Sequence, residues 1–260
     1  MSDLPPHLRP FVLDPAPVTP ERDGNLDLYV PPGDGPFPGV VLVHGGPVPP
    51  ERRPTPRDWA SFRGYGALLA AEGIVAGVVD HRYHVVDGPA GPEVDAPTAA
   101  ADVAAAIGKV RADGRVDGER IAVWAFSGGG LLSADWIRER PGWLRAVFLT
   151  YPMLGSVFEG LRLDPRFDPV AAVTAAGAGA PPIVLTRVGR EREVIADTVA
   201  AFVAAAGAAQ ARLEIVDVPD GHHAFDMVDH TDQSREAVTG AVARLAALLR
   251  GPTRQGVAAS

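Results

Sequence analysis

The sequence predicts an α/β fold in which a mostly parallel central sheet is covered by helices on both faces. Three observations lead to this prediction. Short runs rich in Val, Ile and Leu recur along the chain and have the continuous apolar character of strands that are buried on both sides. Longer segments with apolar residues at helical spacing lie between them. The 29 Gly and 26 Pro fall mostly between the apolar runs, where tight turns are expected.

The strands are predicted from two patterns. Residues 26–30 alternate apolar and polar side chains, which is typical of a half-buried strand. Residues 39–44 form a continuous β-branched run, which is typical of a strand covered on both faces, and the later runs share this character. In chain order, strands are expected over residues 26–30, 39–44, 74–80, 121–126, 145–150, 183–188 and 213–218.

The helices are predicted from apolar residues that recur along one face. In the first of them, Trp59, Phe62 and Tyr65 have helical spacing, and we expect these rings in the core. Because the helices alternate with the strands, each connection crosses over the sheet and leaves neighbouring strands parallel. In chain order, helices are expected over residues 57–72, 98–112, 127–139, 169–176, 194–206 and 234–250.

One domain is expected to fill most of the chain. We expect a proline-rich extended N-terminal arm over residues 1–24, an α/β domain over 25–250, and a flexible tail over 251–260. Residues 151–180 interrupt the alternation of strands and helices, since they hold several prolines and only one short helical segment. We expect this excursion to form a small lid.

Composition and charge argue against several function classes. The formal net charge of −8 is unlike the basic footprint of proteins that bind nucleic acid or anionic membranes. The chain has no Cys, which removes disulfides, thiolate metal sites and a cysteine nucleophile. The N-terminus lacks the basic and apolar regions of a signal peptide, and no apolar stretch is long enough to span a bilayer. We therefore expect a cytoplasmic protein without membrane contact, and the sequence does not determine its oligomeric state.

A serine lies where a strand is expected to turn into a helix, in Ala125-Phe126-Ser127-Gly128-Gly129. A serine held on such a sharp turn projects its hydroxyl above the sheet edge, and small neighbours let strand and helix approach closely. The usual pattern has Gly in place of Ala125, a difference of one methyl group. The alternative interpretation is that Ser127 caps a helix. A phosphate-binding loop fits less well, because no Lys follows and the glycines are out of register.

Glycines also follow the strand expected over 39–44, in Val43-His44-Gly45-Gly46-Pro47. Without a Cβ, such residues can turn their backbone N–H groups into a pocket. We expect Gly45 or Gly46, together with Gly128, to bind a developing oxyanion, while His44 is structural. The alternative interpretation is a turn that merely uses Gly-Pro chemistry.

Two adjacent histidines follow the last expected strand, in Gly221-His222-His223-Ala224-Phe225-Asp226. This loop belongs to the same sheet edge as Ser127, from which a general base can reach the hydroxyl. We expect His223 to be this base, because the following Ala-Phe can pack into the core and hold the imidazole over the site, and we expect His222 to point elsewhere. The alternative is that both histidines face solvent.

Together with Asp80-His81-Arg82, these motifs resemble those of the α/β-hydrolase superfamily, most closely its dienelactone-hydrolase-like and prolyl-oligopeptidase-like esterase branches. The resemblance covers about residues 25–250. It implies the α/β-hydrolase fold and a catalytic triad in the chain order serine, acid, histidine. Dienelactone hydrolases themselves use Cys, so their own activity is not implied.

The resemblance places the acid in the loop after the strand expected over 183–188. Members usually carry Asp there, but this chain has no Asp before Asp197, which falls inside an expected helix. Glu191 is the best candidate for the acid of the triad and Glu193 is the second candidate, since Glu can also orient the histidine. The neighbouring arginines offer an alternative, in which Glu191 is a surface ion-pair partner.

The remaining polar and apolar candidates surround these motifs. We expect Arg82 to anchor its loop by pairing with Asp80 or with the oxyanion loop. No carboxylates with ligand spacing accompany His81 and His84, so neither a metal nor a cofactor is expected. The substrate pocket is expected to be lined by Phe126, Tyr151 and Met153.

These residues predict a serine hydrolase that cleaves a carboxylic ester of a small or medium-sized molecule through an acyl-enzyme on Ser127. The unusual Ala125 and Glu191 motivate a second hypothesis, a non-hydrolytic enzyme on the same fold that performs acyl transfer, cyclisation or C–C cleavage. A third hypothesis is a non-catalytic binding protein, because a fold alone does not establish an activity.

Overall fold

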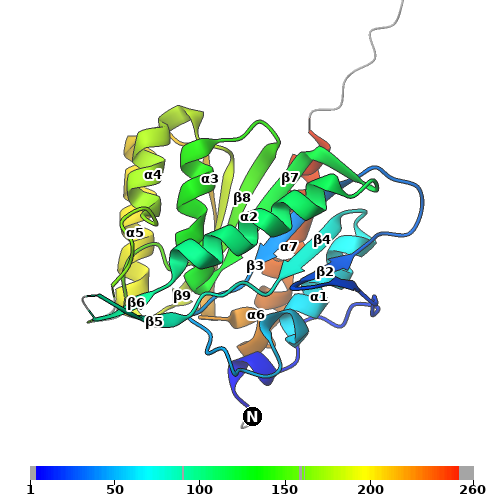
Figure 1. Ribbon diagram of the computed structural model, residues 1–260, viewed down its shortest axis with the longest axis horizontal. Coiled ribbons are helices and arrows are strands. Elements are labelled where there is room, and N and C mark those ends of the chain that lie inside the picture. Colours follow the sequence, from blue (N-terminus) through cyan, green and yellow to red (C-terminus); the bar gives the residue numbers. More distant parts are fainter. Residues whose placement is uncertain (1–3, 90, 158–159, 161, 252–260) are drawn as a thin grey trace, which may run out of the picture.

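A computed structural model of the chain describes residues 4–89, 91–157, 160 and 162–251. Within these residues the main sheet has eight strands in the order β1-β2-β4-β3-β7-β8-β9-β10 (Figure 1). Neighbouring strands from β4 to β10 are parallel, while β1 and β2 add an antiparallel edge. The strands are β1 (Glu21–Asp23), β2 (Leu26–Tyr29), β3 (Phe37–Val43), β4 (Val75–Val79), β7 (Val116–Phe126), β8 (Leu144–Thr150), β9 (Ile183–Arg190) and β10 (Leu213–His222). The predicted mostly parallel sheet is confirmed.

Helices cover both faces of this sheet, also as predicted (Figure 1). One layer consists of α2 (Ala96–Ala112), α3 (Ser133–Glu139), α4 (Pro169–Ala176) and α5 (Glu193–Ala208), and the other of α1 (Ala60–Ala71), α6 (Phe225–Val228) and α7 (Asp232–Arg250). Short 3-10 helices span Pro6–Leu8, Pro56–Asp58, Ser127–Leu132 (η3) and Gly177–Gly179. No helix in the described ranges has both the length and the apolar character needed to cross a membrane.

Successive residues of each central strand pack into opposite layers, because side chains alternate along a strand. In β7, Val123 and Ala125 belong to the core beneath α2 to α5, whereas Trp124 and Phe126 belong to the core beneath α1 and α7. Phe126, the last residue of β7, therefore points away from the layer of α2 to α5.

A two-stranded hairpin was not predicted. Strands β5 (Val85–Gly88) and β6 (Gly91–Val94) pair antiparallel outside the main sheet, at the lower left of Figure 1. Their residues are mostly exposed or half-buried, so no apolar alternation marks them in the sequence.

The N-terminal segment is more integrated than the extended arm that we expected. Its β1 completes the sheet edge, and Phe11 and Val12 are buried. The Phe11 ring packs on α1 at Gly64, where an added Cβ would lie 2.2 Å from Cδ1 of Phe11. Two apolar residues among prolines have no periodicity, which explains why the sequence did not reveal this contact. Of the expected tail, residues 252–260 lie outside the described residues.

The excursion over 151–180 differs from the expected lid in its second half. Helix α4 packs against α3 and α5 and thereby completes a helical layer of the domain. Phe167 is fully buried, and the Arg166 guanidinium donates to Asp135 of α3 at 2.9 and 2.7 Å. Only the first half lies beside the strand ends, and residues 158–159 and 161 of that half are outside the described part of the chain.

Candidate active site

Ser127 lies on the sharp turn between β7 and η3. Its φ of 49° falls in the left-handed region, which is uncommon for a residue other than Gly and costs about 1–3 kcal/mol. Ala125 is fully buried in β7 opposite Val43 of β3, so the sheet accommodates its methyl group. The turn presents the Ser127 hydroxyl to the loop after β10, where Oγ lies 2.7 Å from Nε2 of His223.

The loop after β10 separates the two adjacent histidines. Ala224 has a φ of 63°, and Phe225 is buried, as expected for a residue that holds the loop against the core. The His222 ring is half-exposed and its Nδ1 lies 3.0 Å from Asp229. His223 therefore faces Ser127, whereas His222 points to the surface.

Glu191 directly follows β9 and reaches the other nitrogen of the same imidazole, with Oε2 2.5 Å from Nδ1 of His223. Only 5% of its side chain is exposed, and its second oxygen accepts the Arg192 N–H at 2.8 Å. The Arg190 guanidinium pairs with Asp220 instead, so it does not compete for Glu191. Glu193, the reserve candidate, is exposed at the start of α5.

These contacts define the proton positions that the site favours. A carboxylate accepts from Nδ1–H, which leaves Nε2 unprotonated and able to accept the Ser127 hydroxyl proton. The structure thus brings Ser127, His223 and Glu191 into one hydrogen-bonded row, although they come from three separate strand ends.

The loop over residues 44–47, where we expected an oxyanion hole, approaches the turn at Ser127 closely enough to require glycine. A Cβ at Gly45 would lie 2.7 Å from the Ser127 Cβ, and one at Gly128 would lie 2.4 Å from the Gly46 carbonyl oxygen. Contacts this short force the surrounding backbone to move. The two motifs are therefore packed directly on one another.

His44 stacks on His81 beneath this loop, with ring centroids 3.6 Å apart and planes 6° from parallel. Nδ1 of His44 donates to the Gly45 carbonyl at 2.5 Å, and Nε2 of His81 donates to the His44 carbonyl at 3.1 Å. Burial lowers the pKa of His44 to about 4 and holds the pKa of His81 well below its ordinary value. Both rings are neutral at pH 7, which suits a structural role for His44.

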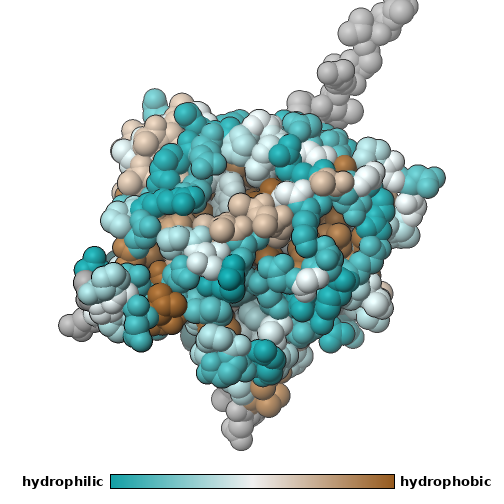
Figure 2. Space-filling view, viewed as in Figure 1, coloured by the Kyte–Doolittle hydropathy of each residue, from teal (hydrophilic) through white to brown (hydrophobic). Residues whose placement is uncertain are grey.

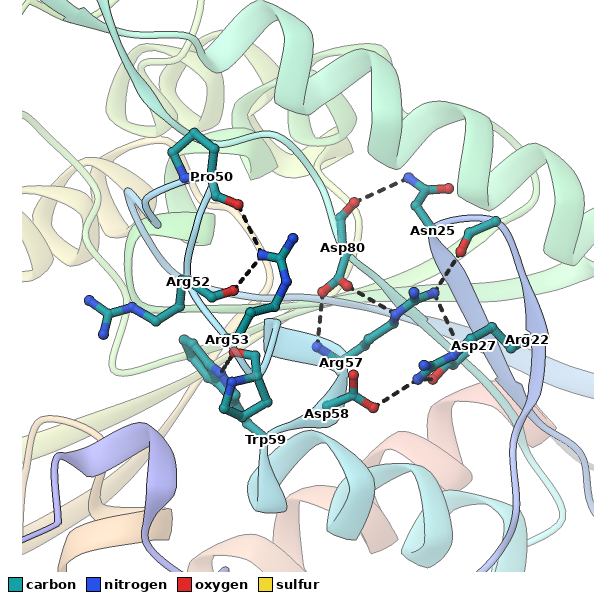
Figure 3. A network of polar contacts seen from close by, with 12 residues as sticks. Arg22, Asn25, Asp27, Pro50, Arg52, Arg53, Arg57, Asp58, Trp59 and Asp80 are labelled. Carbon is teal, nitrogen blue, oxygen red and sulfur yellow. Dashed lines mark hydrogen bonds and ion pairs between the residues drawn. The ribbon is translucent and has the colours of Figure 1, made fainter.

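A polar network fixes the segment that continues from the oxyanion loop to α1 (Figure 3). The Arg57 N–H donates to Asp80 at 2.9 Å, and its guanidinium lies 3.0 Å from the same carboxylate. The guanidinium also reaches Asp27 at 3.3 Å. Asp27 of β2 is fully buried, and the pairs with Arg22 and Arg57 compensate its charge.

Arg82 has a different partner from the expected one. Its guanidinium and its N–H donate to Asp102 of α2 at 2.8 to 2.9 Å. Asp80 is not available to Arg82, because its carboxylate is occupied by the N–H and the guanidinium of Arg57. Among the described residues, no group of His, Asp and Glu is arranged to hold a metal ion.

The three expected pocket residues have separate environments. Phe126 packs among Phe62, Tyr65 and Trp124 in the α1–α7 core, and its place in a substrate pocket stays a prediction. The alternation along β7 turns it away from the first layer. Tyr151 borders a hollow of about 280 Å³ together with Glu191, and Met153 borders a much smaller cavity near η3.

The sequence analysis missed a second carboxylate. Asp226 is fully buried and accepts the Tyr151 hydroxyl at 2.9 Å on both oxygens, while the Tyr151 ring centroid lies 5.0 Å from that of His223. Burial raises the pKa of Asp226 to about 6, although hydrogen bonds from Tyr151 and Tyr65 oppose the shift. The signal that could have revealed it is an acidic residue within the apolar run 224–228.

Comparison with known proteins finds the fold again among solved structures. No family model matches the chain, and no curated protein does. The apo form of Thermogutta terrifontis esterase 2 is similar with a TM-score of 0.64 and 22% identity, over 83% of this chain and 86% of that one. The same esterase phosphorylated by paraoxon is similar with a TM-score of 0.63 and 22% identity, over 83% of this chain and 85% of that one.

A fungal esterase from Rhizomucor miehei is similar with a TM-score of 0.66 and 21% identity, over 91% of this chain and 83% of that one. At such identities the likeness concerns the fold. The chain therefore has the fold of these esterases, which is the α/β-hydrolase fold that the motifs implied.

Proposed function

We propose that the protein is a serine hydrolase that cleaves a carboxylic ester of a small or medium-sized molecule through an acyl-enzyme on Ser127. The observation that carries this proposal is the 2.7 Å contact between Ser127 Oγ and His223 Nε2, on a turn whose backbone is strained. A serine hydroxyl is a weak nucleophile unless an adjacent base removes its proton. The similarity in fold to esterases supports the same reaction class.

The proposed reaction uses each group in turn. His223 takes the Ser127 proton as Oγ attacks the ester carbonyl, and Glu191 stabilises the resulting imidazolium. The carbonyl oxygen becomes an oxyanion, which the N–H groups of Gly128 and of Gly45 or Gly46 bind. His223 then protonates the leaving alcohol. In the second half of the reaction His223 takes a proton from a water molecule that attacks the acyl carbonyl, and it returns this proton to Ser127 Oγ as the Oγ–acyl bond breaks and the carboxylic acid leaves.

Organophosphorus probes test the nucleophile directly. Paraoxon phosphorylates one esterase of similar fold, so a fluorophosphonate or paraoxon is expected to modify this protein once, on Ser127. The Ser127→Ala variant should not be labelled. Ser133→Ala is the matched control, since Ser133 lies in the same helical segment and bonds only to the Gly130 carbonyl. Intact-mass and peptide mass spectrometry measure the modification, and labelling that persists in Ser127→Ala contradicts the proposal.

Turnover tests the base. His223→Ala is expected to lower kcat for p-nitrophenyl acetate by about 10⁴- to 10⁶-fold, as the loss of a triad member does in other serine hydrolases. A variant that keeps more than a tenth of the wild-type kcat would show that another group activates Ser127.

A further inference from the structure

Three residues around His223 have a backbone conformation that residues other than Gly rarely adopt. Ser127, Tyr151 and Ala224 have φ values of 49°, 38° and 63°. Ser127 is the proposed nucleophile, and Ala224 directly follows the proposed base. Such a strained conformation persists only where the surrounding structure enforces it, and it is concentrated at functional sites. Tyr151 takes no part in the proposed reaction, so its strain points to a further role.

The other positive φ values outside glycine, within the described residues, have an ordinary reason. Arg140 ends α3, and Gln210 follows the end of α5. Helices commonly end on a left-handed residue, because this conformation gives the last carbonyl groups a hydrogen-bond partner. Tyr151 instead follows the strand β8, beside the candidate site. The helix-end explanation does not apply to it.

Hydrogen bonds hold the backbone at Tyr151 between two of the strand ends that form the site. The Tyr151 N–H donates to the Thr186 carbonyl of β9 at 3.0 Å. Two residues later, the Met153 N–H donates to the Ser127 carbonyl at 2.9 Å. Since β9 leads to Glu191, the segment that carries Tyr151 is fixed relative to both the nucleophile and the acid.

The Tyr151 hydroxyl is anchored on a buried carboxylate. It lies 2.9 Å from each oxygen of Asp226, which is in α6, three residues after His223, and Tyr65 bonds to the same carboxylate. The face of the molecule in Figure 2 is mostly hydrophilic, as expected when polar groups stay in water, whereas Asp226 is fully buried. A carboxylate away from water depends on its hydrogen bonds. This contact therefore ties the end of the Tyr151 ring to the segment that carries His223.

The Tyr151 ring packs against the proposed base. Its centroid lies 5.0 Å from that of the His223 imidazole, and the two planes are 57° apart. The imidazole is also bonded through Nε2 to Ser127 and through Nδ1 to Glu191. Two hydrogen bonds hold a ring at two points and leave it free to rock about the line between them. A neighbouring ring packed against the imidazole restricts this motion.

Tyr151 is poorly suited to transfer a proton itself. Burial, and after it the charge of Asp226, raise the pKa of Tyr151 well above its ordinary value. Its hydroxyl hydrogen is also donated to Asp226 and points away from the reaction. What Tyr151 contributes is the place of its ring.

We propose that Tyr151 is a positioning residue, which keeps the His223 imidazole in line with Ser127 while Asp226 keeps the Tyr151 ring in place. The inference rests on the proposed serine hydrolase function and adds a residue to it. Because Tyr151 acts through His223 and not on the substrate, loss of its ring should slow the proton transfers and hardly change substrate binding. If Tyr151 only fills the core, its loss should affect stability alone.

The variant Tyr151→Leu removes the ring and keeps an apolar side chain. We expect kcat for p-nitrophenyl acetate to fall by about 100-fold, since a misplacement of about 1 Å can cost that much. KM should stay within about 3-fold of the wild-type value, because the lost interaction concerns the transition state. Exhaustive fluorophosphonate labelling counts the active sites, so that unfolded molecules do not lower the measured kcat. A kcat within about 3-fold of the wild-type value would overturn the proposal.

The matched control is Tyr29→Leu. Tyr29 is also buried, but it lies in β2 and packs on α1 at Gly66. Its loss should lower the unfolding midpoint and leave kcat within about 3-fold of the wild-type value, because no catalytic group depends on its ring. If Tyr29→Leu loses as much kcat as Tyr151→Leu, the loss reflects core packing in general and the positioning role is wrong.

The variant Tyr151→Phe tests the anchor on Asp226. It keeps the ring and removes the hydrogen bond, so we expect a smaller displacement and a kcat about 3- to 10-fold below the wild-type value. Because Phe keeps the shape of the core, this variant decides the question if Tyr151→Leu does not fold. A kcat within about 2-fold of the wild-type value would overturn the role of Asp226 and the proposal with it.

The wild-type protein separates the two possible failures. If it cleaves p-nitrophenyl acetate and is labelled on Ser127, but Tyr151→Leu has the same kcat, the positioning role is wrong and the proposed function stands. If the wild type cleaves no ester and is not labelled on Ser127, the proposed function is wrong and the positioning role is wrong with it.

Discussion

Glu191 and Asp226 are both carboxylates near His223, but only Glu191 touches the imidazole. Glu191 lies at the end of a strand, and the Arg192 N–H and the His223 ring satisfy its oxygens. Asp226 lies in the core, where two tyrosines are its partners and burial raises its pKa to about 6. Both side chains are almost fully buried, so it is the hydrogen-bond partners that distinguish the two carboxylates: an imidazole and a backbone N–H for Glu191, tyrosine hydroxyls for Asp226.

The largest expected difference between the two carboxylates concerns turnover. Glu191→Gln should lower kcat by about 10³- to 10⁴-fold, because the amide neither carries the charge nor selects the productive histidine tautomer. Steady-state kinetics with p-nitrophenyl acetate measure this loss. Glu193→Gln is the matched control, since Glu193 is exposed on the next turn. If both variants lose activity equally, Glu191 has no special role.

The second prediction concerns how stability depends on pH. The folded-state pKa of Asp226 is about 6 and its ordinary value is 3.8, so the folded state binds this proton more tightly than the unfolded state. The contribution of Asp226 to the free energy of unfolding is therefore lost as the pH rises from about 4 to above 6. A shift of about two pKa units corresponds to roughly 3 kcal/mol.

Urea unfolding of the wild type and of Asp226→Asn between pH 4 and 7 tests this dependence of the free energy of unfolding on pH. The wild type should lose roughly 3 kcal/mol relative to the variant over that range, because Asn does not titrate. Asp232→Asn is the control, since Asp232 is almost fully exposed. Parallel curves for wild type and Asp226→Asn would mean that the buried carboxylate does not titrate in this window.

A third, smaller effect is expected at the tyrosine that separates Asp226 from His223. Tyr151→Phe keeps the ring and removes one hydrogen bond to a charged group, which should lower the free energy of unfolding by about 2 kcal/mol at pH 7.5. The loss should be smaller at pH 5, where Asp226 is mostly protonated. Denaturant unfolding of the wild type and of Tyr151→Phe at both pH values measures the decrease in the free energy of unfolding. An equal decrease at both pH values would contradict the expectation that Asp226 is ionised at pH 7.5 and mostly protonated at pH 5.

The smallest effect is expected at the neighbouring histidine. His222 is half-exposed and pairs with Asp229 at the surface, where such a pair contributes about 0–1 kcal/mol. His222→Ala should therefore leave kcat within about 3-fold of the wild-type value and hardly change the unfolding midpoint. A loss comparable to that of His223→Ala would mean that the loop presents the other imidazole to Ser127.

Much of the fold was predictable because its signals are local. The apolar runs of β3, β7 and β9 and the helical spacing in α1, α2 and α7 identify buried strands and amphipathic helices from neighbouring residues alone. The hairpin β5–β6 and the packing of Phe11 on Gly64 were not predictable, since they depend on partners distant in the chain. The sequence did not show that Phe126 faces the core beneath α1 and α7, because its position next to Ser127 does not tell which face of the sheet it occupies.

By itself the sequence determined most strands and helices of the main sheet and its two layers, the turn that carries Ser127, the glycine motif after β3, and the order of the candidate residues along the chain. Each of these depends on residues only a few positions apart. The tertiary structure alone decided that Glu191 reaches His223, that Asp226 is buried under Tyr151, and that Arg82 pairs with Asp102. These contacts join separate strand ends, and they depend on the register of the sheet, which pairs Arg190 with His222 and so brings the next residue of each strand together.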